Sequence, residues 1–371
     1  MPTASSWATT WSTSSGKRTP AATWCARSSG RRRPRPLSPS IRWSASPILG
    51  GPLRRDRGPP LPLRFSLART FAGRNRTSHP RRLSMPPPDV IFASVLDGLL
   101  LGFVYGLAAM GLTLIWGVME VINLAHGPVI TLGMFGLFFL FQGLGLHPYL
   151  ALPLVVVGGL LLGLLIYGVA VHRVLDAPHL STLLATFSVN MMIIGLGTAA
   201  FTTTPRNVDF SLGAVEIGPL RLLGTRVVAA LVAVLFTVAL YVFLYRTRTG
   251  KMVRAVANNR AAAELMGIPS TRILALSFGI GTLLATGAGG LIATLFPFNI
   301  FTGGVYELKS FVICVLGGLG NPTGALLGGI ILGLIEGFIP PFLPVGWTPV
   351  IEFVLFVVIL LIRPSGLLGA R

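Results

Sequence analysis

Ionisable side chains are few inside the apolar segments of this sequence. The candidates for moving an ion are Asp97, Glu120, His126 and Glu336. A carrier driven by an ion gradient needs such groups buried in its membrane spans, where they are costly and are kept for function. The three carboxylates fall near the ends of apolar segments, where a charge reaches water at little cost. This sparse set weakens the hypothesis of ion-driven transport.

A second set of residues is polar and lies at interruptions of apolar segments or at mid-span. The candidates for lining a passage across the membrane are Asn123, His126, Ser188, Asn190 and Asn321. His126 belongs to an interruption, although a lone histidine is more often a hydrogen-bonded structural residue than a proton relay. For Ser188 and Asn190, hydrogen bonds between helices are the alternative to a place on the path.

Motifs for enzymatic chemistry are lacking in residues 85–371. This region contains no phosphate-binding loop, zinc pattern, nucleophile elbow or plausible pair of catalytic carboxylates. Cys25 and Cys314 are too far apart to indicate a disulfide framework or a metal site. We therefore predict no catalytic residue, no metal and no cofactor. Energy for any transport has to come from an ion gradient or from a partner protein.

The composition indicates which elements position these residues. The 371 residues are 52% hydrophobic and 11% charged, with a mean hydropathy of +0.75, whereas soluble domains are about a quarter charged. Many apolar segments are long enough to cross about 30 Å of hydrocarbon. The sequence therefore predicts an all-α polytopic membrane protein with about eight transmembrane helices. Their expected ranges are 90–116, 121–141, 150–170, 181–202, 227–245, 273–297, 308–338 (interrupted) and 347–362.

The basic charge of the chain is concentrated in its first 84 residues. Residues 1–84 carry 17 Lys and Arg against one acid, whereas residues 85–371 carry 13 against ten. The membrane region is thus nearly neutral, and we predict no nucleic-acid partner. Residues 1–84 show no apolar period, so we expect no packed core there. They could be a basic arm, a transit peptide or an over-extended start; MPPPDVIFASVLDG at 85–98 resembles a natural beginning and favours the last.

The loop 246–272 carries the clearest signal for orientation in the membrane. It contains six basic residues against one acid, Glu264. Short loops rich in Lys and Arg stay on the cytoplasmic side. We therefore expect this loop inside the cell, residues 203–226 outside and residues 171–180 inside.

Two apolar segments contain polar or helix-breaking interruptions, VINLAHGPVITLG at 121–133 and VLGGLGNPTGALLGG at 315–329. If each is a broken or re-entrant helix, both chain termini lie in the cytoplasm. Paired interruptions in the two halves of a membrane protein also point to a transport path. An ordinary turn between two spans is the alternative for 315–329.

The stretch RAAAELMGIPSTRI at 260–273 looks like a helix of a water-soluble protein. Its alanine-rich run favours a helix, which Gly267 ends and Pro269 does not continue, while Ser270 can cap the next helix. Such a helix fits another protein's groove, although it could also rest on lipid headgroups. The candidate contact residues are Ala261, Ala262, Ala263, Glu264, Leu265, Met266 and Gly267.

This loop and three other stretches resemble a known family. The loop resembles the coupling loop of ABC-importer permeases, whose pattern is Glu-Ala-Ala, three residues and Gly. Ala262, Ala263 and Gly267 match, and Ala261 stands at the Glu position, a departure common in branched-chain amino acid permeases of the LivH type. Members of that group also resemble GLTLIWGVMEVINLAHGPVITLG (111–133), LKSFVICVLGGLGNPTGALLGGIILGLIE (308–336) and LLIRPSGLLG (360–369).

The resemblance implies a multi-pass permease subunit in a bacterial inner membrane, formed by residues 85–371 with the ABC-importer permease fold. It implies four partners besides membrane lipid: a homologous second permease, two cytoplasmic ABC ATPases and an extracytoplasmic substrate-binding protein. The implied substrates are branched-chain or other hydrophobic amino acids. Urea and short amides are rival substrates, and an ion-coupled secondary transporter or a channel is the alternative from a different class.

Overall fold

The computed structural model of the protein describes residues 87–217, 220–363 and 365–369; the predictions for residues 1–84 lie outside these ranges. Regular structure in the described ranges is almost entirely helical. The elements are α1 (Pro88–Met119), α2 (His126–Leu144), α3 (Pro148–Ile166) with the π-helical turn η1 (Tyr167–Val171), α4 (His179–Phe201), α5 (Gly224–Arg246), α6 (Arg248–Asn258), α7 (Arg260–Leu265), α8 (Ser270–Ala293), α9 (Thr302–Gly317), α10 (Pro322–Phe338), the 3-10 turn η2 (Val345–Trp347) and α11 (Thr348–Ile362). Strands β1 (Ala214–Ile217) and β2 (Leu220–Leu223) pair antiparallel between α4 and α5.

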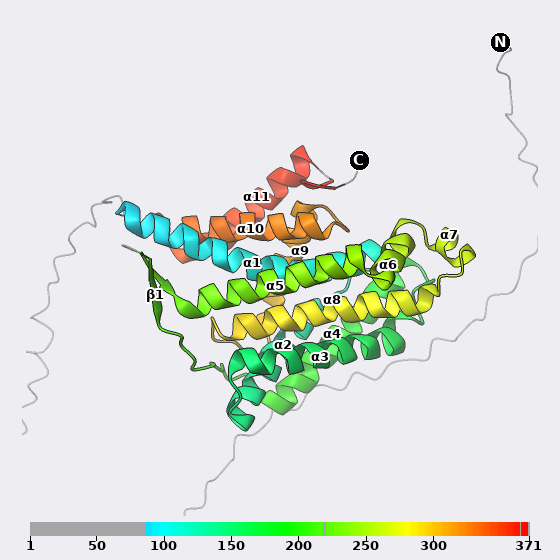
Figure 1. Ribbon diagram of the computed structural model, residues 1–371, viewed down its shortest axis with the longest axis horizontal. Coiled ribbons are helices and arrows are strands. Elements are labelled where there is room, and N and C mark those ends of the chain that lie inside the picture. The colour runs from blue at the N-terminus through cyan, green and yellow to red at the C-terminus, as the bar shows by residue number, and fades with distance from the viewer. Residues whose placement is uncertain (1–86, 218–219, 364, 370–371) are drawn as a thin grey trace, which may run out of the picture. The chain divides into compact units, whose positions relative to one another are not determined.

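The long helices run side by side between two ends of a bundle (Figure 1). We name these the hairpin end, which carries β1 and β2, and the loop end, which carries α6 and α7. Within the described ranges, seven helices are long and apolar enough to cross a membrane, and α9 and α10 form a bent pair. The predicted all-α membrane protein with about eight spans is thus confirmed. The 32 residues of α1 reach about 48 Å, which exceeds the hydrocarbon thickness of about 30 Å.

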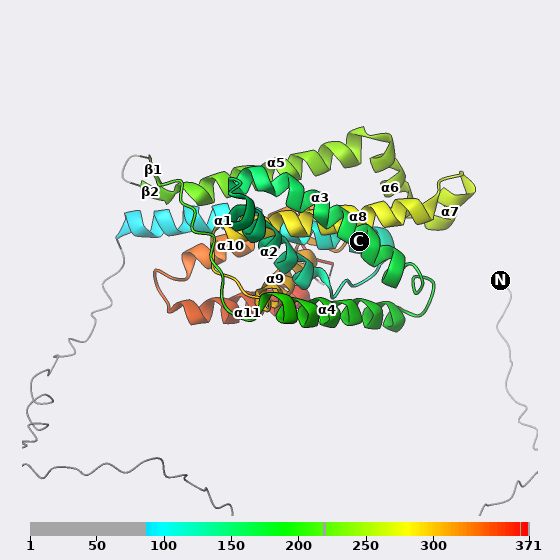
Figure 2. The same cartoon turned by 90° about the horizontal axis from the view of Figure 1, so that it is seen from below.

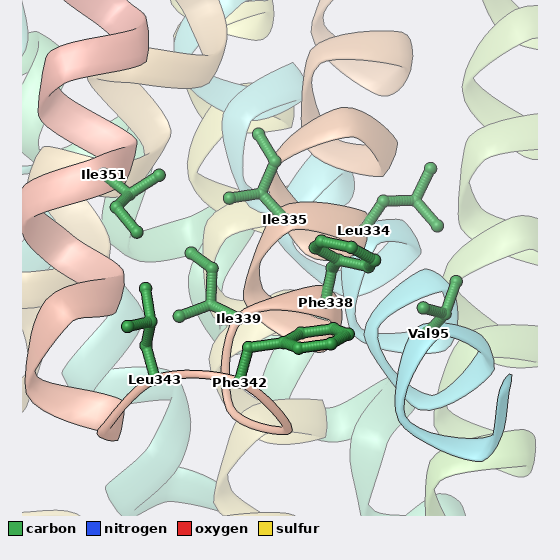
Figure 3. Close-up of a pocket in the computed structure, with 8 residues that line it drawn as sticks. All are labelled: Val95, Leu334, Ile335, Phe338, Ile339, Phe342, Leu343 and Ile351. Carbon is green, nitrogen blue, oxygen red and sulfur yellow. The ribbon is translucent and has the colours of Figure 1, made fainter. Parts of the chain in front are cut away.

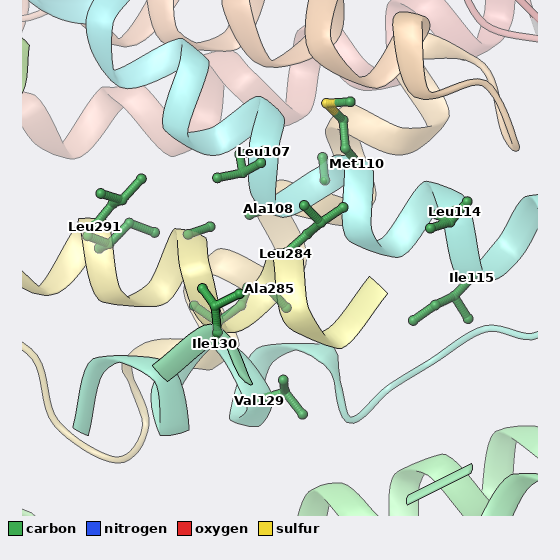
Figure 4. Close-up of a cluster of buried hydrophobic side chains, with 14 of the residues drawn as sticks. Leu107, Ala108, Met110, Leu114, Ile115, Val129, Ile130, Leu284, Ala285 and Leu291 are labelled. Carbon is green, nitrogen blue, oxygen red and sulfur yellow. The ribbon is translucent and has the colours of Figure 1, made fainter. Parts of the chain in front are cut away.

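The core of the bundle lies where α1, α2 and α8 meet. Leu107 and Met110 of α1 pack with Ile130 of α2 and Leu284 of α8, and all four side chains are buried (Figure 4). Glycines allow the backbones to approach closely elsewhere. A methyl group on Gly333 of α10 would collide with backbone atoms of Gly98 and Gly102 on α1. In lipid, burial of apolar side chains gives helices little reason to associate. Small residues instead let the helices approach closely enough for van der Waals contacts to hold them together.

The interruption expected at 315–329 is a turn between two helices. The chain changes direction by 117° between α9 and α10. Gly320 in this turn touches Gly117 near the end of α1. α10 then runs back along α1 until the hydroxyl of Ser94 donates to the carbonyl of Gly337 at 2.6 Å. Residues 302–338 therefore form a pair of helices that runs to the loop end and back, joined by a turn at 318–321.

The two ends of the described chain lie at opposite ends of the bundle. The start of α1 lies at the hairpin end, where Asp97 forms an ion pair with Arg226 at the start of α5. The segment after α11 lies at the loop end, where the N–H of Leu368 donates to the carbonyl of Gly317 at 3.1 Å. Two termini on one side are expected only if both interrupted segments are broken or re-entrant. That condition fails at 121–141, because α2 continues from the break to the hairpin end, where α3 begins beside α5.

The interruption expected at 121–133 is a break that precedes α2. Residues 120–125 are non-helical, and α2 begins at His126 beside Ala108, well inside α1. A second break, which the sequence analysis does not predict, lies at 294–301 between α8 and α9, where Arg206 and Phe298 form an antiparallel bridge. Both α2 and α9 thus begin inside the bundle, and their first turns touch at Gly127 and Gly303.

Candidate translocation path and coupling surface

Three of the five predicted path residues meet at the break before α2. Nδ2 of Asn190 on α4 donates to the carbonyl of Leu124 at 2.6 Å, and Oδ1 of Asn123 accepts from the N–H of Ala125 at 3.1 Å. Nε2 of His126 lies 3.0 Å from the carbonyl of Ala108. A carbonyl only accepts, so Nε2 carries the proton and donates. The bonds to Leu124 and Ala125 serve backbone groups that the break leaves unpaired. The bond from His126 ties the start of α2 to the middle of α1.

The same three residues keep hydrogen-bonding capacity that no described residue uses. Nδ2 of Asn123, Nδ1 of His126 and Oδ1 of Asn190 are buried without a hydrogen-bond partner among the described residues. Buried polar groups are normally paired with protein, water or ligand. The break is therefore a candidate site for a small polar molecule, and the place of these residues on a transport path stays a prediction.

Ser188 and Asn321 lie apart from this group. Ser188 faces outward from α4, and its hydroxyl donates to the carbonyl of Leu184 one turn earlier at 2.7 Å. Asn321 lies in the turn at the loop end and caps α10, since its Oδ1 accepts from the N–H of Thr323 at 3.0 Å. Its Nδ2 donates to the carbonyl of Leu368 at 3.1 Å. These contacts give Asn321 a structural role, and they do not involve the break before α2.

A cluster of polar and charged side chains lies within the spans, and of its members the sequence analysis names Glu336 but not its partners. Nζ of Lys309 on α9 lies 2.7 Å from Oε2 of Glu336 on α10 and 3.5 Å from Oε1 of Glu352 on α11. Tyr105 on α1 donates to Oε1 of Glu336 at 3.3 Å. We name these four residues the charge cluster; it joins four helices. Lys309 and Glu352 were detectable as charged residues inside apolar segments.

An apolar pocket of about 570 Å³ lies near the hairpin end between α1, α10 and the start of α11 (Figure 3). Hydrocarbon side chains line it, among them Phe338, Phe342 and Ile351, and no polar atom is exposed in it. Such a pocket offers no partner to the charged groups of an amino acid. The break before α2 is therefore the better candidate site for a polar solute.

The predicted coupling helix forms the tip of the loop end. α7 displays Leu265 and Met266, which are 89% and 83% exposed, whereas Ala263 is buried against the bundle. Gly267 has a φ of 80°, and the N–H of Ile268 donates to the carbonyl of Ala263 at 3.1 Å. This left-handed glycine ends α7 as predicted. The docking role of these residues stays a prediction.

Two details of the loop differ from the prediction. The loop forms two helices, because Asn259 is extended and its Oδ1 accepts from the N–H of Ala262 at 2.9 Å, which caps α7. The expected cap by Ser270 is wrong. Its hydroxyl is buried without a partner in the described chain, and α8 begins after Pro269 without a side-chain cap.

Arg260 fixes the position of α7. Its guanidinium lies 3.0 Å from Oδ1 of Asp176 and 3.1 Å from Oε1 of Glu264. Partial burial alone would lower the pKa of Arg260, but its hydrogen bonds to Glu264 and Asp176 raise the pKa further, so the guanidinium stays charged. The Asp176 contact also places residues 171–180 at the loop end, as the sequence predicts.

Comparisons with known proteins agree with this arrangement. Residues 94–362 match the family model "Branched-chain amino acid transport system / permease component". The chain is 31% identical to the high-affinity branched-chain amino acid transport system permease protein LivH of Salmonella typhimurium, over 74% of this chain and 94% of that protein. It is 30% identical to the corresponding protein BraD of Pseudomonas aeruginosa, over 77% and 98%. A shorter match, 29% identical over 50% and 58%, is to the ribose import permease protein RbsC of Haemophilus influenzae. The chain therefore belongs to the family of branched-chain amino acid transport permeases, as a multi-pass transport subunit of the inner membrane.

Proposed function

We propose that the chain is the membrane-spanning subunit of an ATP-driven importer for branched-chain or other hydrophobic amino acids. The exposure of Leu265 and Met266 at the tip of the loop end carries this proposal. The partners would be a homologous second permease, two cytoplasmic ABC ATPases and an extracytoplasmic substrate-binding protein. The basic loop 246–272 faces the cytoplasm in this arrangement, so the hairpin end receives the substrate from the binding protein.

The contacts around α7 explain how an ATPase could move the spans. α7 leads directly into α8 through the turn at Gly267–Pro269, and α8 packs against α1, α2 and α3 in the core. α6 is held to α5, since Nε of Arg254 donates to the carbonyl of Leu244 at 3.1 Å. A displacement of α7 would therefore move α8 directly and α5 through α6, with each helix moving as a rigid body. The break at 294–301 comes directly after α8. α8 also contacts α2, and the break at 120–125 comes directly before α2.

Substitution in the loop tests this coupling. Gly267→Arg and Glu264→Lys should abolish amino acid uptake and reduce co-purification of the ATPases, because both alter the exposed contact without touching the core. Membrane insertion should remain normal. Uptake is measured with labelled leucine in cells that express the whole importer.

Gly145→Arg is the matched control. Gly145 has a φ of 64° and open space around it, as Gly267 does, so the two substitutions impose similar backbone strain. Gly145 ends α2 at the hairpin end, and its substitution should leave ATPase co-purification unchanged. Normal uptake and normal co-purification in both loop variants would sink the docking proposal.

A further inference from the structure

Glu307 lies at the crossing of the two helices that begin inside the bundle. It is the sixth residue of α9, and its side chain lies against the first turn of α2. A methyl group placed on Gly127 would come within 2.7 Å of Oε2 of Glu307. One turn earlier on α9, Gly303 touches the backbone of Gly127. The carboxylate therefore sits beside the N-terminus of α2, where unpaired peptide N–H groups give a partial positive charge.

Three other carboxylates deeper in the described spans have cationic partners, whereas Asp89 is exposed at the first turn of α1. Asp97 pairs with Arg226, and Glu336 and Glu352 share Lys309. Glu307 has no ion pair among the described residues. An ionisable residue inside the membrane is costly and marks a functional site unless it is paired. The partial charge of one helix end compensates a full negative charge only in part.

Unused polar groups lie at the same helix end. Nδ1 of His126 and Nδ2 of Asn123 are buried, both residues being at most 2% exposed, and neither atom has a partner in the described chain. His126 is the first residue of α2, and Asn123 lies in the break immediately before it. Neither atom is used by the fold. Buried polar and charged groups are costly unless they are paired. A ligand with a positive charge and hydrogen-bonding groups would pair with Glu307 and with these two atoms at the start of α2.

The surface beside Glu307 is open on the described chain. Phe301, Val305, Leu308 and Phe311 of α9 are exposed, and Glu307 is half-buried next to them. Figures 1 and 2 show α9 between α4 and α11, on the face of the bundle opposite α5. A carboxylate next to hydrocarbon is energetically costly. We therefore expect a water-lined path or a second permease, rather than lipid, against this face of α9.

We propose that Glu307 binds the α-ammonium group of the transported amino acid. This inference rests on the proposed function and narrows its substrate class to solutes with an ammonium group. An ion pair formed away from bulk water is far stronger than one in water. Urea, amides and sugars offer hydrogen bonds but no positive charge, so Glu307 selects for amino acids after the binding protein has released them.

The test uses the complete importer, reconstituted with its binding protein and with ATP inside the vesicles. Glu307→Gln keeps the size of the side chain and removes its charge. It should lower uptake of labelled leucine at least about tenfold, while hydrolysis of ATP stimulated by the binding protein is retained. Glu307→Asp, which keeps the charge, should recover part of the uptake. Glu216→Gln is the matched control, since Glu216 is an exposed carboxylate in the hairpin.

The outcomes separate this inference from the proposed function. If the wild-type importer takes up leucine and Glu307→Gln does so at the same rate, the role of Glu307 is overturned and the proposed function stands. If Glu307→Gln loses stimulated ATP hydrolysis together with uptake, Glu307 acts in assembly rather than in binding, and the inference is again overturned. If the wild-type importer takes up urea and no leucine, the proposed substrate class is wrong.

Discussion

Lys309 compensates the charge of two carboxylates from different helices. Its ammonium group contacts Glu336 and Glu352 and lies 4.8 Å from the centre of the Tyr105 ring. Burying charges is tolerated only when their partners are present, and removal of one partner is more costly than replacement of the whole set by neutral groups. The charge cluster therefore holds α9, α10 and α11 together only as long as it is complete.

Lys309→Met should lower the stability of the protein by about 3–5 kcal/mol, because the buried carboxylate of Glu352 and the partly buried carboxylate of Glu336 then lack their cation. The measurement is the thermal unfolding midpoint of the purified importer. The neutral variant Lys309→Met/Glu336→Gln/Glu352→Gln should recover much of the loss. Arg221→Met is the control; its ion pair with Glu216 is solvent-exposed and contributes less than about 1 kcal/mol. Equal midpoints for Lys309→Met and the wild type would contradict this account.

The sequence alone identifies polar residues that interrupt or lie within apolar segments. It does not show which residues of other helices these side chains contact. Asn123 and His126 stand out because they interrupt an apolar segment, and Asn190 because it is polar at mid-span. The charge cluster is harder to foresee, since Lys309 and Glu336 are 27 residues apart and meet only because the chain reverses between them. Glu307 is a candidate only because α2 lies beside α9. No local sequence pattern predicts that these two helices are neighbours.

At the scale of elements, close contact between α1 and α10 decides whether the bundle packs. Glycines of α1 face α10 and the turn before it, from Gly98 and Gly337 near the hairpin end to Gly117 of α1 and Gly320 of the turn near the loop end. With no side chains between them, the two backbones lie in contact along this length. Dispersion and weak polar contacts then stabilise a pair that gains little from hydrophobic burial in lipid.

Gly333→Leu should destabilise the bundle by about 1–3 kcal/mol or more, because a side chain there collides with the backbone of α1. Gly158→Leu is the matched control, since Gly158 lies within α3 with nothing near its missing side chain. The yield of folded protein and its thermal midpoint measure both effects. A Gly333→Leu variant as stable as Gly158→Leu would show that α1 and α10 do not pack in this way.

The sequence predicts the long helices to within a few residues because apolar length and flanking polar residues decide where a span begins and ends. For example, the expected span 227–245 is α5, from Gly224 to Arg246. The sequence fails where long-range contacts decide the structure. The break at 294–301 is stabilised by its bridge to residue 206, and the reversal at 318–321 depends on the end of α1. The expected side of the N-terminal part is wrong for another reason: α2 runs on to the hairpin end, so the segment at 121–141 crosses instead of re-entering.

At the scale of the whole molecule, the loop end and the interior of the bundle have different features. The loop end displays an exposed helix that suits docking of an ATPase, and the interior contains two helices that begin at mid-bundle beside an unpaired carboxylate. Between them lies α8, which connects the docking helix to the core in one continuous element. This layout accounts for transport by a chain whose residues 85–371 carry no recognisable nucleotide-binding motif.

Leucine uptake by the reconstituted importer, in vesicles without any ion gradient, tests the central claim most directly. ATP inside the vesicles and binding protein outside should together drive accumulation of labelled leucine, and omission of either should stop it. Urea should not accumulate under the same conditions. Accumulation of leucine driven by an ion gradient in the absence of ATP would contradict the account and favour a secondary transporter.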